Sequence, residues 1–285
     1  MAAAVSPDWT GRTNRGRYTR MVIPIRLAHT TTRMRHNAHV RQTGIRGSSM
    51  AQEPQAEQAG DQSRYSDVLV IVPAFNEGTA IGAVVADLRR QFPHVLVIDD
   101  GSADDTGQVA KEAGAHVARH LVNIGQGGAL ATGFQVAARM PRFSWVVTFD
   151  ADGQHRVSDA AAMVDAGREQ GVDIVLGTRF GAGSSNASAL KRAILRAGTR
   201  YTRLTTGLAV TDTHNGLRAL TSDLAKRIEF EDRGMGHASD ILDFIAHHDV
   251  SWIELPIHIE YTDYSKAKGQ SMTNAVNILF DRWLR

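Results

Sequence analysis

Two aspartates separated by a single residue carry the most informative chemistry in this sequence. Asp150 and Asp152 follow the apolar stretch Trp145 to Phe149, which has the composition of a buried strand. Because side chains alternate along a strand, both carboxylates can point the same way and share one divalent cation. Mg²⁺ takes oxygen ligands and usually leaves positions open for substrate phosphates. The spacing favours a metal–diphosphate site, and a plain polar turn is the alternative that it leaves open.

Three other polar clusters follow short apolar runs in the same way. These runs are residues 68–72, 95–98 and 173–176, and they lead into the clusters Pro73 to Glu77, Asp99 to Thr106 and Gly177 to Arg179. Helix-like stretches lie between them, as in an α/β fold whose mostly parallel sheet has helices on both faces. Since ligands bind at the carboxyl ends of such strands, we expect all four clusters on one edge of the sheet.

Apolar periodicity predicts the elements that position these clusters. Helices are expected over residues 80–91, 126–139, 157–170 and 189–204, and a strand over 252–261. Ser102 and Asp105 have the spacing of a capping box, so a further helix should begin directly after the second cluster. The closing segment, residues 274–285, either packs against the domain or lies on a membrane surface or membrane partner.

Charge is distributed unevenly along the 285 residues. Residues 1–50 contain nine arginines and one acid, a balance of +8, so the net charge of +2 leaves 2 − 8 = −6 for the remainder. We therefore expect a disordered Arg-rich tail over residues 1–64 and one domain over 65–285, with no nucleic-acid partner for the domain. The tail could instead be a targeting peptide, an arm for anionic membranes or nucleic acid, or an over-extended start. The absence of cysteine excludes disulfides and thiolate metal sites.

Taken in order, the clusters resemble the family 2 glycosyltransferases, whose fold is the GT-A nucleotide-sugar-binding fold. The resemblance covers about residues 67–271 and rests on motifs at 73–77, 99–106, 123–129, 150–155 and 177–180. Within the family the chain is most similar to the branch that transfers a sugar to dolichyl or polyprenyl phosphate. That similarity rests on the segments 212–218 and 266–271. One departure is Gln126, which stands where many relatives have lysine.

The resemblance implies a role for each motif residue. Nucleotide contacts would come from Pro73, Phe75, Glu77, Ile98, Asp99 and Asp100. Mg²⁺ or Mn²⁺ would be bound by Asp150, Asp152 and Gln154, with Ala151 and His155 beside the substrate. Anionic oxygens would be bound by Arg179, Arg218, Lys266 and Lys268. Asp152 and Arg179 are thereby predicted to be catalytic, because the cation would bridge the diphosphate and neutralise charge on the leaving nucleotide.

The reaction implied by the resemblance is an inverting transfer of a hexose from a UDP- or GDP-hexose. A lipid phosphate acceptor is already ionised and needs no base, whereas a hydroxyl of a glycan or glycolipid does. Hydroxyl-directed relatives have a Glu-Asp pair where this chain has Ser239 and Asp240, so a phosphate acceptor is favoured. Two alternatives for Asp240 stay open, namely a catalytic base for a hydroxyl acceptor and a helix N-cap.

Two other classes of protein are compared with this interpretation. A catalytically silent nucleotide-sugar-binding subunit stays open, although the complete acidic set disfavours it. A sugar nucleotidyltransferase would need a basic loop that residues 73–78 lack. We expect a cytoplasmic protein, either free or peripheral at the cytoplasmic face of the membrane, since no stretch approaches the roughly 18 apolar residues of a membrane span.

Overall fold

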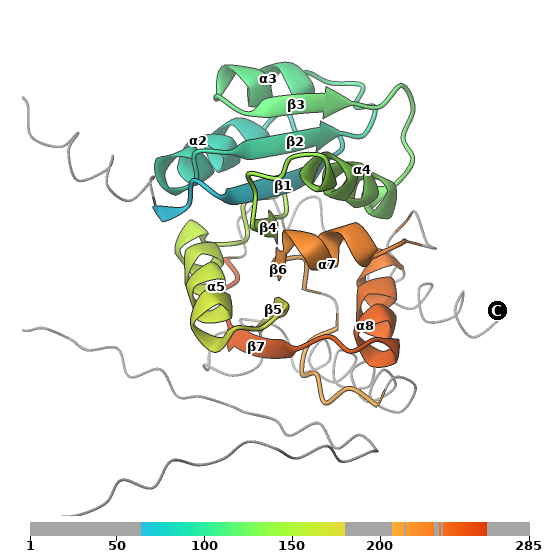
Figure 1. Cartoon of the computed structure of the whole chain (residues 1–285). Coiled ribbons are helices and arrows are strands. Elements are labelled where there is room, and N and C mark those ends of the chain that lie inside the picture. The colour runs from blue at the N-terminus through green and yellow to red at the C-terminus, as the bar shows by residue number, and fades with distance from the viewer. Residues whose placement is uncertain (1–63, 180–206, 214, 231–233, 235, 261–285) are drawn as a thin grey trace, which may run out of the picture.

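Among the described residues, seven strands form one mixed sheet with the order β3-β2-β1-β4-β6-β5-β7 (Figure 1). They are β1 (Val68–Ala74), β2 (Val95–Asp99), β3 (His116–Arg119), β4 (Trp145–Thr148), β5 (Ile174–Thr178), β6 (Arg218–Thr221) and β7 (Trp252–Pro256). β6 is antiparallel to β4 and β5, and the other pairings are parallel. The carboxyl ends of the six parallel strands therefore lie on one edge, together with the amino end of β6.

This computed structural model describes residues 64–179, 207–213, 215–230, 234 and 236–260. Several predictions fall outside these residues. They are the tail before residue 64, the helix over 189–204, the closing segment, and the basic residues Lys266 and Lys268.

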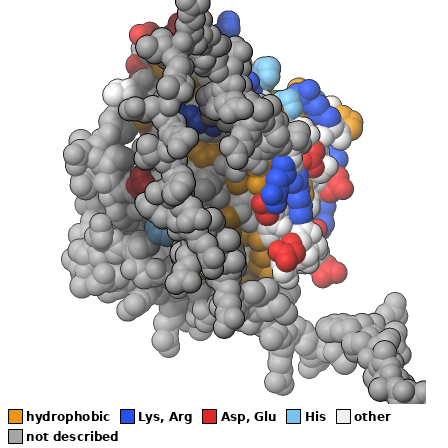
Figure 2. All heavy atoms as spheres, turned by 90° about the vertical axis from the view of Figure 1, so that its left-hand side faces the viewer, with side chains coloured by type: hydrophobic (Ala, Val, Ile, Leu, Met, Phe, Trp, Pro, Cys, Tyr) orange, Lys and Arg blue, Asp and Glu red, His pale blue; other side chains and the backbone are white. Residues whose placement is uncertain are grey.

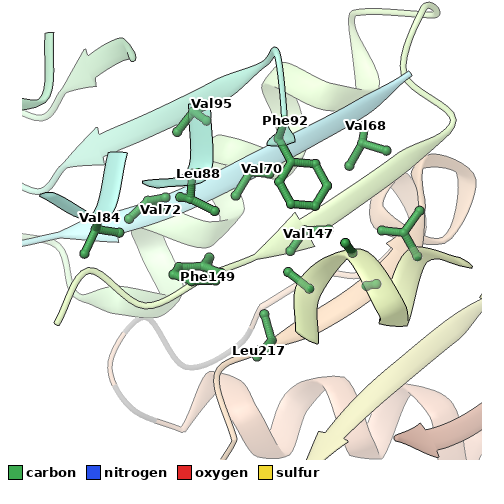
Figure 3. Close-up of a cluster of buried hydrophobic side chains, with 14 of the residues drawn as sticks. Val68, Val70, Val72, Val84, Leu88, Phe92, Val95, Val147, Phe149 and Leu217 are labelled. Carbon is green, nitrogen blue, oxygen red and sulfur yellow. The ribbon is translucent and has the colours of Figure 1, made fainter. Parts of the chain in front are cut away.

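Helices cover both faces of the sheet. One face carries α2 (Ile81–Gln91), α3 (Thr106–Glu112) and α5 (Val157–Gln170), and the other carries α4 (Gln126–Ala138), α7 (Ser222–Arg227) and α8 (His237–His247). Strand β1 contributes alternate residues to two cores. Val68, Val70 and Val72 pack with Leu88 and Phe92 on the first face (Figure 3), whereas Leu69 and Ile71 pack against α4 on the second. Burial on both faces explains why these strands are continuous apolar runs, and the predicted α/β class is confirmed.

Two glycines let helices approach the sheet closely. A Cβ atom at Gly133 of α4 would overlap with Ile71 of β1. One at Gly167 of α5 would overlap with the ring of Trp145 in β4. Because both neighbours are packed core side chains with little room to move, only glycine permits these helix–strand contacts.

Several predicted boundaries are confirmed and others need correction. The helices expected over 80–91, 126–139 and 157–170 are found within one residue of their predicted ends. The helix expected directly after the second cluster is confirmed as α3. Its capping box is wrong, because α3 has no side-chain cap and Ser102 Oγ instead accepts a hydrogen bond from the N–H of Asn76. The last strand is shorter than expected because β7 ends at Pro256, opposite the final residue of β5. Strands β3 and β6 and helix α7 were not predicted.

On the face seen in Figure 2, acidic and basic side chains are intermingled over the described part. Exposed ion pairs such as Arg90–Asp87 on α2 (2.9 Å) are typical of a solvated helix and stabilise it little. Among the helices that the structure describes, none has the length and apolarity needed to cross a membrane.

Candidate active site

The four polar clusters meet at one rim of the sheet. Strand β1 lies between β2 and β4, so the loops that follow these three strands are neighbours. Glu77 is close enough to Asp152 for its charge to affect the pKa of that carboxyl. Strand β5 runs in the same direction as β4, which brings Arg179 to the same edge, and Arg218 begins β6 beside Thr148. The gathering expected of parallel strand ends is therefore found.

The loop after β1 is fastened to the loop after β2. Three N–H groups of the first loop donate to side-chain oxygens of the second, at 2.8 to 3.0 Å, in the pairs Asn76–Ser102, Glu77–Thr106 and Gly78–Asp104. The N–H of Ala103 donates back to Asn76 Oδ1 at 2.8 Å. Asn76 itself has a φ of 53°, a left-handed conformation that asparagine tolerates better than most residues. These bonds make the two loops one wall of the rim.

The predicted nucleotide contacts divide into exposed and buried residues. Phe75 is 42% exposed at the rim, and Glu77 is partly exposed. Pro73 and Ile98 are buried strand residues, and Ile98 belongs to the core beneath α4. Asp99 has no exposed surface; its Oδ1 accepts the N–H of Ser102 (2.9 Å). Ile98 and Asp99 thus support the rim from within the protein, and their contact with a nucleotide stays a prediction.

Asp100 binds the protein's own loop with both carboxylate oxygens. Oδ1 accepts the N–H of Ile124 (3.0 Å) and contacts His120 Nδ1 (2.7 Å), and Oδ2 accepts the N–H of Gly125 (2.7 Å). The other ring nitrogen of His120 contacts Thr132 Oγ1 on α4 at 2.9 Å. Only 3% of Asp100 is exposed. In this structure Asp100 holds the loop before α4, and the expected bond to a base would require that loop to move.

Asp150 is surrounded by donors and positive charge. His155 Nε2 contacts its Oδ2 at 2.9 Å, and the Gln126 amide at the start of α4 donates to its Oδ1 at 3.3 Å. Burial alone would raise its pKa. The hydrogen bond from His155 and the charges of His155, His237 and Arg218 outweigh burial and hold the pKa of Asp150 below its ordinary value. Asp150 is therefore ionised at neutral pH.

Asp152 is under the opposite influence. Burial and the negative charges of Asp150 and Glu77 raise the pKa of Asp152 to about 6, although the N–H of Gln154 donates to its Oδ1 at 3.1 Å. Among the described residues, no group of three or more histidines, cysteines, aspartates or glutamates is arranged to bind a metal ion. Two carboxylates fit Mg²⁺ or Mn²⁺ only if a ligand's phosphates and water complete the coordination, which is how Mg²⁺ is usually held in proteins.

The two arginines of the rim have acidic neighbours. Arg179 makes a bidentate salt bridge with Asp212, in which Nε donates to Oδ2 and Nη2 donates to Oδ1, both at 2.7 Å. Arg218 is only 3% exposed, and burial lowers its pKa to about 10 despite the nearby charges of Asp150 and Asp212. Arg179 remains at the rim, whereas Arg218 supplies a buried positive charge behind Asp150.

Helix α8 begins close to this rim. The N–H of Gly127 in α4 donates to the carbonyl of Gly234, just before α8, and the charge of His237 acts on Asp150. Asp240 lies in the first turn of α8, one turn beyond this point. Gly236 occupies the N-cap position without a side-chain cap, so the alternative that Ser239 or Asp240 caps the helix is wrong.

The structure adds residues that sequence reasoning did not assign. Gln126 was noted only as a departure, yet it donates to Asp150. Gly216 packs against Asp150 so closely that a Cβ atom there would overlap with the carboxylate. Asp212 lies in the motif at 212–218 and Glu254 in the strand expected over 252–261, and neither pattern indicates what these side chains contact. Their contacts are between distant parts of the chain, which no local pattern reveals.

Comparison with known proteins gives a consistent picture. The family model described as "Glycosyl transferase family 2" matches residues 69–228, more than half of the chain. An uncharacterised protein of Methanocaldococcus jannaschii is 35% identical over 220 residues, which are 75% of this chain and 90% of that protein. Undecaprenyl-phosphate mannosyltransferase of Micrococcus luteus is 30% identical over 235 residues, 76% of this chain and 96% of that enzyme.

A solved structure shares the fold. It is glucosyl-3-phosphoglycerate synthase from Mycobacterium tuberculosis in complex with Mn²⁺, uridine diphosphate and phosphoglyceric acid. The TM-score is 0.54 at 18% identity, and the match covers 82% of this chain and 84% of that one. At this identity the likeness concerns the arrangement of strands and helices alone.

Proposed function

Because the chain belongs to glycosyl transferase family 2, and is thus a glycosyltransferase with the GT-A fold, we propose that it transfers a sugar from a nucleotide sugar to a polyprenyl phosphate. The observation that carries this proposal is the pair Asp150 and Asp152 at the rim. One carboxylate is kept ionised, and the other has a pKa raised to about 6 by burial and by the charges of Asp150 and Glu77. A divalent cation would relieve that repulsion.

We assign Mg²⁺ or Mn²⁺ to Asp150 and Asp152, with Gln154 beside them. When bound, the cation would neutralise charge on the leaving nucleoside diphosphate. His155 and Gln126 hold the Asp150 carboxylate in place through their contacts with its two oxygens. Phe75, exposed where the two fastened loops meet, would contact the nucleotide. Arg179 would donate to anionic oxygens of donor or acceptor, and attack from the opposite side would invert the anomeric carbon.

A lipid phosphate is the acceptor that can react at this rim without a catalytic base. The attacking phosphate oxygen is already ionised, so no base has to take a proton. The mannosyltransferase of Micrococcus luteus, which aligns over most of both chains, is named for an undecaprenyl phosphate acceptor. A lipid acceptor would bring the protein to a membrane surface, and we propose peripheral action there.

Transfer to a hydroxyl is the second candidate, and the position of α8 favours keeping it. The start of α8 lies beside the start of α4, and Asp240 is in its first turn. If a sugar hydroxyl were the acceptor, Asp240 would be the base. Replacing it with asparagine separates the two candidates, because a phosphate acceptor does not need that base.

The experiment that tests the proposal follows both products. The protein is incubated with undecaprenyl phosphate in detergent, Mn²⁺ or Mg²⁺, and GDP-mannose, UDP-glucose or UDP-N-acetylglucosamine in turn. We expect one donor to yield lipid-linked sugar together with nucleoside diphosphate. Asp152→Asn should lower kcat/KM by ~100-fold or more, and Asp240→Asn should have little effect.

The matched control is Asp87→Asn, an exposed aspartate on α2 paired with Arg90, which should leave activity unchanged. Near-normal activity of Asp152→Asn would remove the metal assignment. A wild-type protein that glycosylates an added soluble glycan but not undecaprenyl phosphate, and that loses this transfer in Asp240→Asn, would replace the phosphate acceptor by a hydroxyl.

A further inference from the structure

A carboxylate outside the acid pair organises the neighbouring part of the rim. Glu254 lies in β7, in register with Leu176 of β5. Its Oε1 accepts the N–H of Thr211 at 2.6 Å, and its Oε2 accepts the hydroxyl of the same threonine at 2.8 Å. The N–H of Asp212 also donates to Oε1, at 3.4 Å. One side chain thus fixes the two residues that precede the segment leading into β6.

The same two residues hold the end of β5. The hydroxyls of Thr211 and Thr178 are hydrogen-bonded at 2.7 Å. Arg179, which follows Thr178, donates three hydrogen bonds to the Asp212 carboxylate. One comes from its backbone N–H (3.1 Å) and two come from its guanidinium (both 2.7 Å). A continuous chain of hydrogen bonds therefore runs from Glu254, through Thr211 and Asp212, to the guanidinium of Arg179.

We propose that Glu254 is a positioning residue, which sets the direction of the Arg179 guanidinium by fixing the Thr211–Asp212 segment. The inference rests on the proposed function, in which Arg179 binds anionic oxygens of the substrates. A long arginine side chain has many rotamers, and a rigid partner that holds its planar fork decreases the freedom lost when a phosphate binds. A side chain that contacts the substrate keeps its geometry only if the residues that hold it are themselves fixed.

Burial shows how tightly this support is built. The side chain of Asp212 is 1% exposed and that of Arg179 is 15% exposed. Burial raises the pKa of Glu254, and the hydrogen bonds from Thr211 and Asp212 counteract this rise only in part. A carboxylate in such a place is unfavourable unless its oxygens are bonded. The two backbone N–H groups and the hydroxyl that converge on Glu254 supply those bonds.

A double-mutant cycle tests the inference in the assay described above, with undecaprenyl phosphate and the donor that is turned over. Glu254→Ala should lower kcat/KM roughly tenfold, and Arg179→Ala should lower it more. If Glu254 acts through Arg179, the double variant should be no worse than Arg179→Ala, within about twofold. Glu254→Gln should retain activity within about twofold, because the amide oxygen still accepts the backbone N–H groups and the amide nitrogen can bond the hydroxyl of Thr211.

Other variants keep the inference testable if Glu254→Ala folds poorly. Thr211→Val removes the two hydroxyl bonds but no backbone N–H. It should lower kcat/KM less than Glu254→Ala does, and this decrease should disappear in the Arg179→Ala background. Glu112→Ala, at an exposed glutamate that ends α3, is the control and should match the wild type. Thermal melting of each variant identifies losses due to unfolding.

Each outcome has a distinct meaning. Losses that multiply in the double variant would show that Glu254 supports the fold generally and would overturn the inference, while the proposed function would stand. Full activity of Arg179→Ala would instead remove the role of Arg179 from the proposed function, and the inference with it.

Discussion

The different pKa values of Asp150 and Asp152 reflect how far burial of each carboxylate is compensated by its neighbours. Hydrogen bonds and positive neighbours stabilise the ionised form of Asp150. Burial and the negative charges of Asp150 and Glu77 destabilise the ionised form of Asp152. Without a cation, ionised Asp152 should therefore destabilise the fold. The same charge should stabilise a bound cation. The negative charge that destabilises the free protein is therefore the one that turnover requires.

Replacing Asp152 with asparagine should stabilise the protein in EDTA. The folded pKa, about 6, lies above the ordinary value of 3.8, so the folded state holds this proton more tightly than the unfolded state does. The contribution of Asp152 to stability is complete below pH 4 and is lost as pH rises through 6. At pH 8, Asp152→Asn should raise the free energy of unfolding by up to about 3 kcal/mol, since one pKa unit corresponds to about 1.4 kcal/mol.

Urea unfolding at pH 8 and pH 4 checks this prediction. The advantage of the variant should be largest at pH 8 and should fade towards pH 4, where the carboxyl of the folded wild type is protonated and no longer destabilises the fold. With Mn²⁺ and UDP or GDP the wild type should gain stability and the variant should gain less. Equal stability of the two proteins in EDTA at pH 8 would show that the acid pair is not strained.

Residue types in the acid pair were predictable from the sequence, but their partners were not. Asp150 and Asp152 follow a clear apolar strand, so their place at a strand end was readable. The contacts of Asp100 with Ile124 and Gly125, and of Arg179 with Asp212, join positions 24 to 33 residues apart. Such contacts depend on how loops cross the rim, whereas the sequence pattern indicated only the ligand roles of these side chains.

At the scale of elements, the turn into β6 supports Asp150 from behind. Gly216 lies against the Asp150 carboxylate, and its carbonyl accepts the hydroxyl of Thr148 at 2.6 Å, which fixes the backbone there. Gly216→Ala would place a Cβ atom within overlap distance of both carboxylate oxygens. Asp150 would have to leave His155 and Gln126, and kcat/KM should fall about tenfold or more. Overpacking should also destabilise the protein by about 1–3 kcal/mol.

Gly171→Ala is the matched control for this change. Gly171 ends α5 with a φ of 62°, and no atom lies within 4 Å of a Cβ built there. Alanine in this left-handed conformation should destabilise the protein by about 1 kcal/mol without touching the rim. A kcat/KM as low for Gly171→Ala as for Gly216→Ala would show that lost stability, not displacement of Asp150, causes the effect.

The elements missed by sequence reasoning share a physical reason. Strand β3 is a four-residue edge strand, His116–Arg119, whose residues are partly or fully exposed, so it lacks an apolar run. Strand β6 is also four residues long and begins with the buried Arg218. Its antiparallel place between β4 and β5 follows from the path of the chain through space. By contrast, β1, β2, β4 and β5 were predictable because burial on both faces requires unbroken apolar sequence.

The whole molecule places its chemistry on one edge because almost all its strands run the same way. The two sets of helices fix the sheet from both faces, and the loops at the carboxyl edge are then free to specialise. This division separates the effects of mutation: core positions such as Gly133 should affect stability, whereas rim positions should affect turnover. Residues before 64 lie outside the described structure, and their removal tests the predicted domain boundary.

A variant that lacks residues 1–60 should keep the fold and the activity. The first described contacts lie after the cut: Arg64 pairs with Asp165 at 2.9 Å, and the hydroxyl of Tyr65 donates to the same carboxylate at 2.9 Å. The family match begins later still, at residue 69. We expect a melting temperature within about 2 °C of the full chain and kcat/KM in detergent within about twofold, because the described contacts and the family match both begin after the cut.

Removal of the tail also reverses the net charge, which makes its role measurable. Residues 1–60 carry nine arginines and three acids, a balance of +6, so the remainder has 2 − 6 = −4. If the tail is an arm for anionic membranes, the full chain should co-sediment with vesicles rich in phosphatidylglycerol and the shortened chain should not, with a strong dependence on salt. Equal binding by both chains would assign membrane contact to the domain. Loss of activity in detergent would instead show that the folded enzyme begins before residue 61.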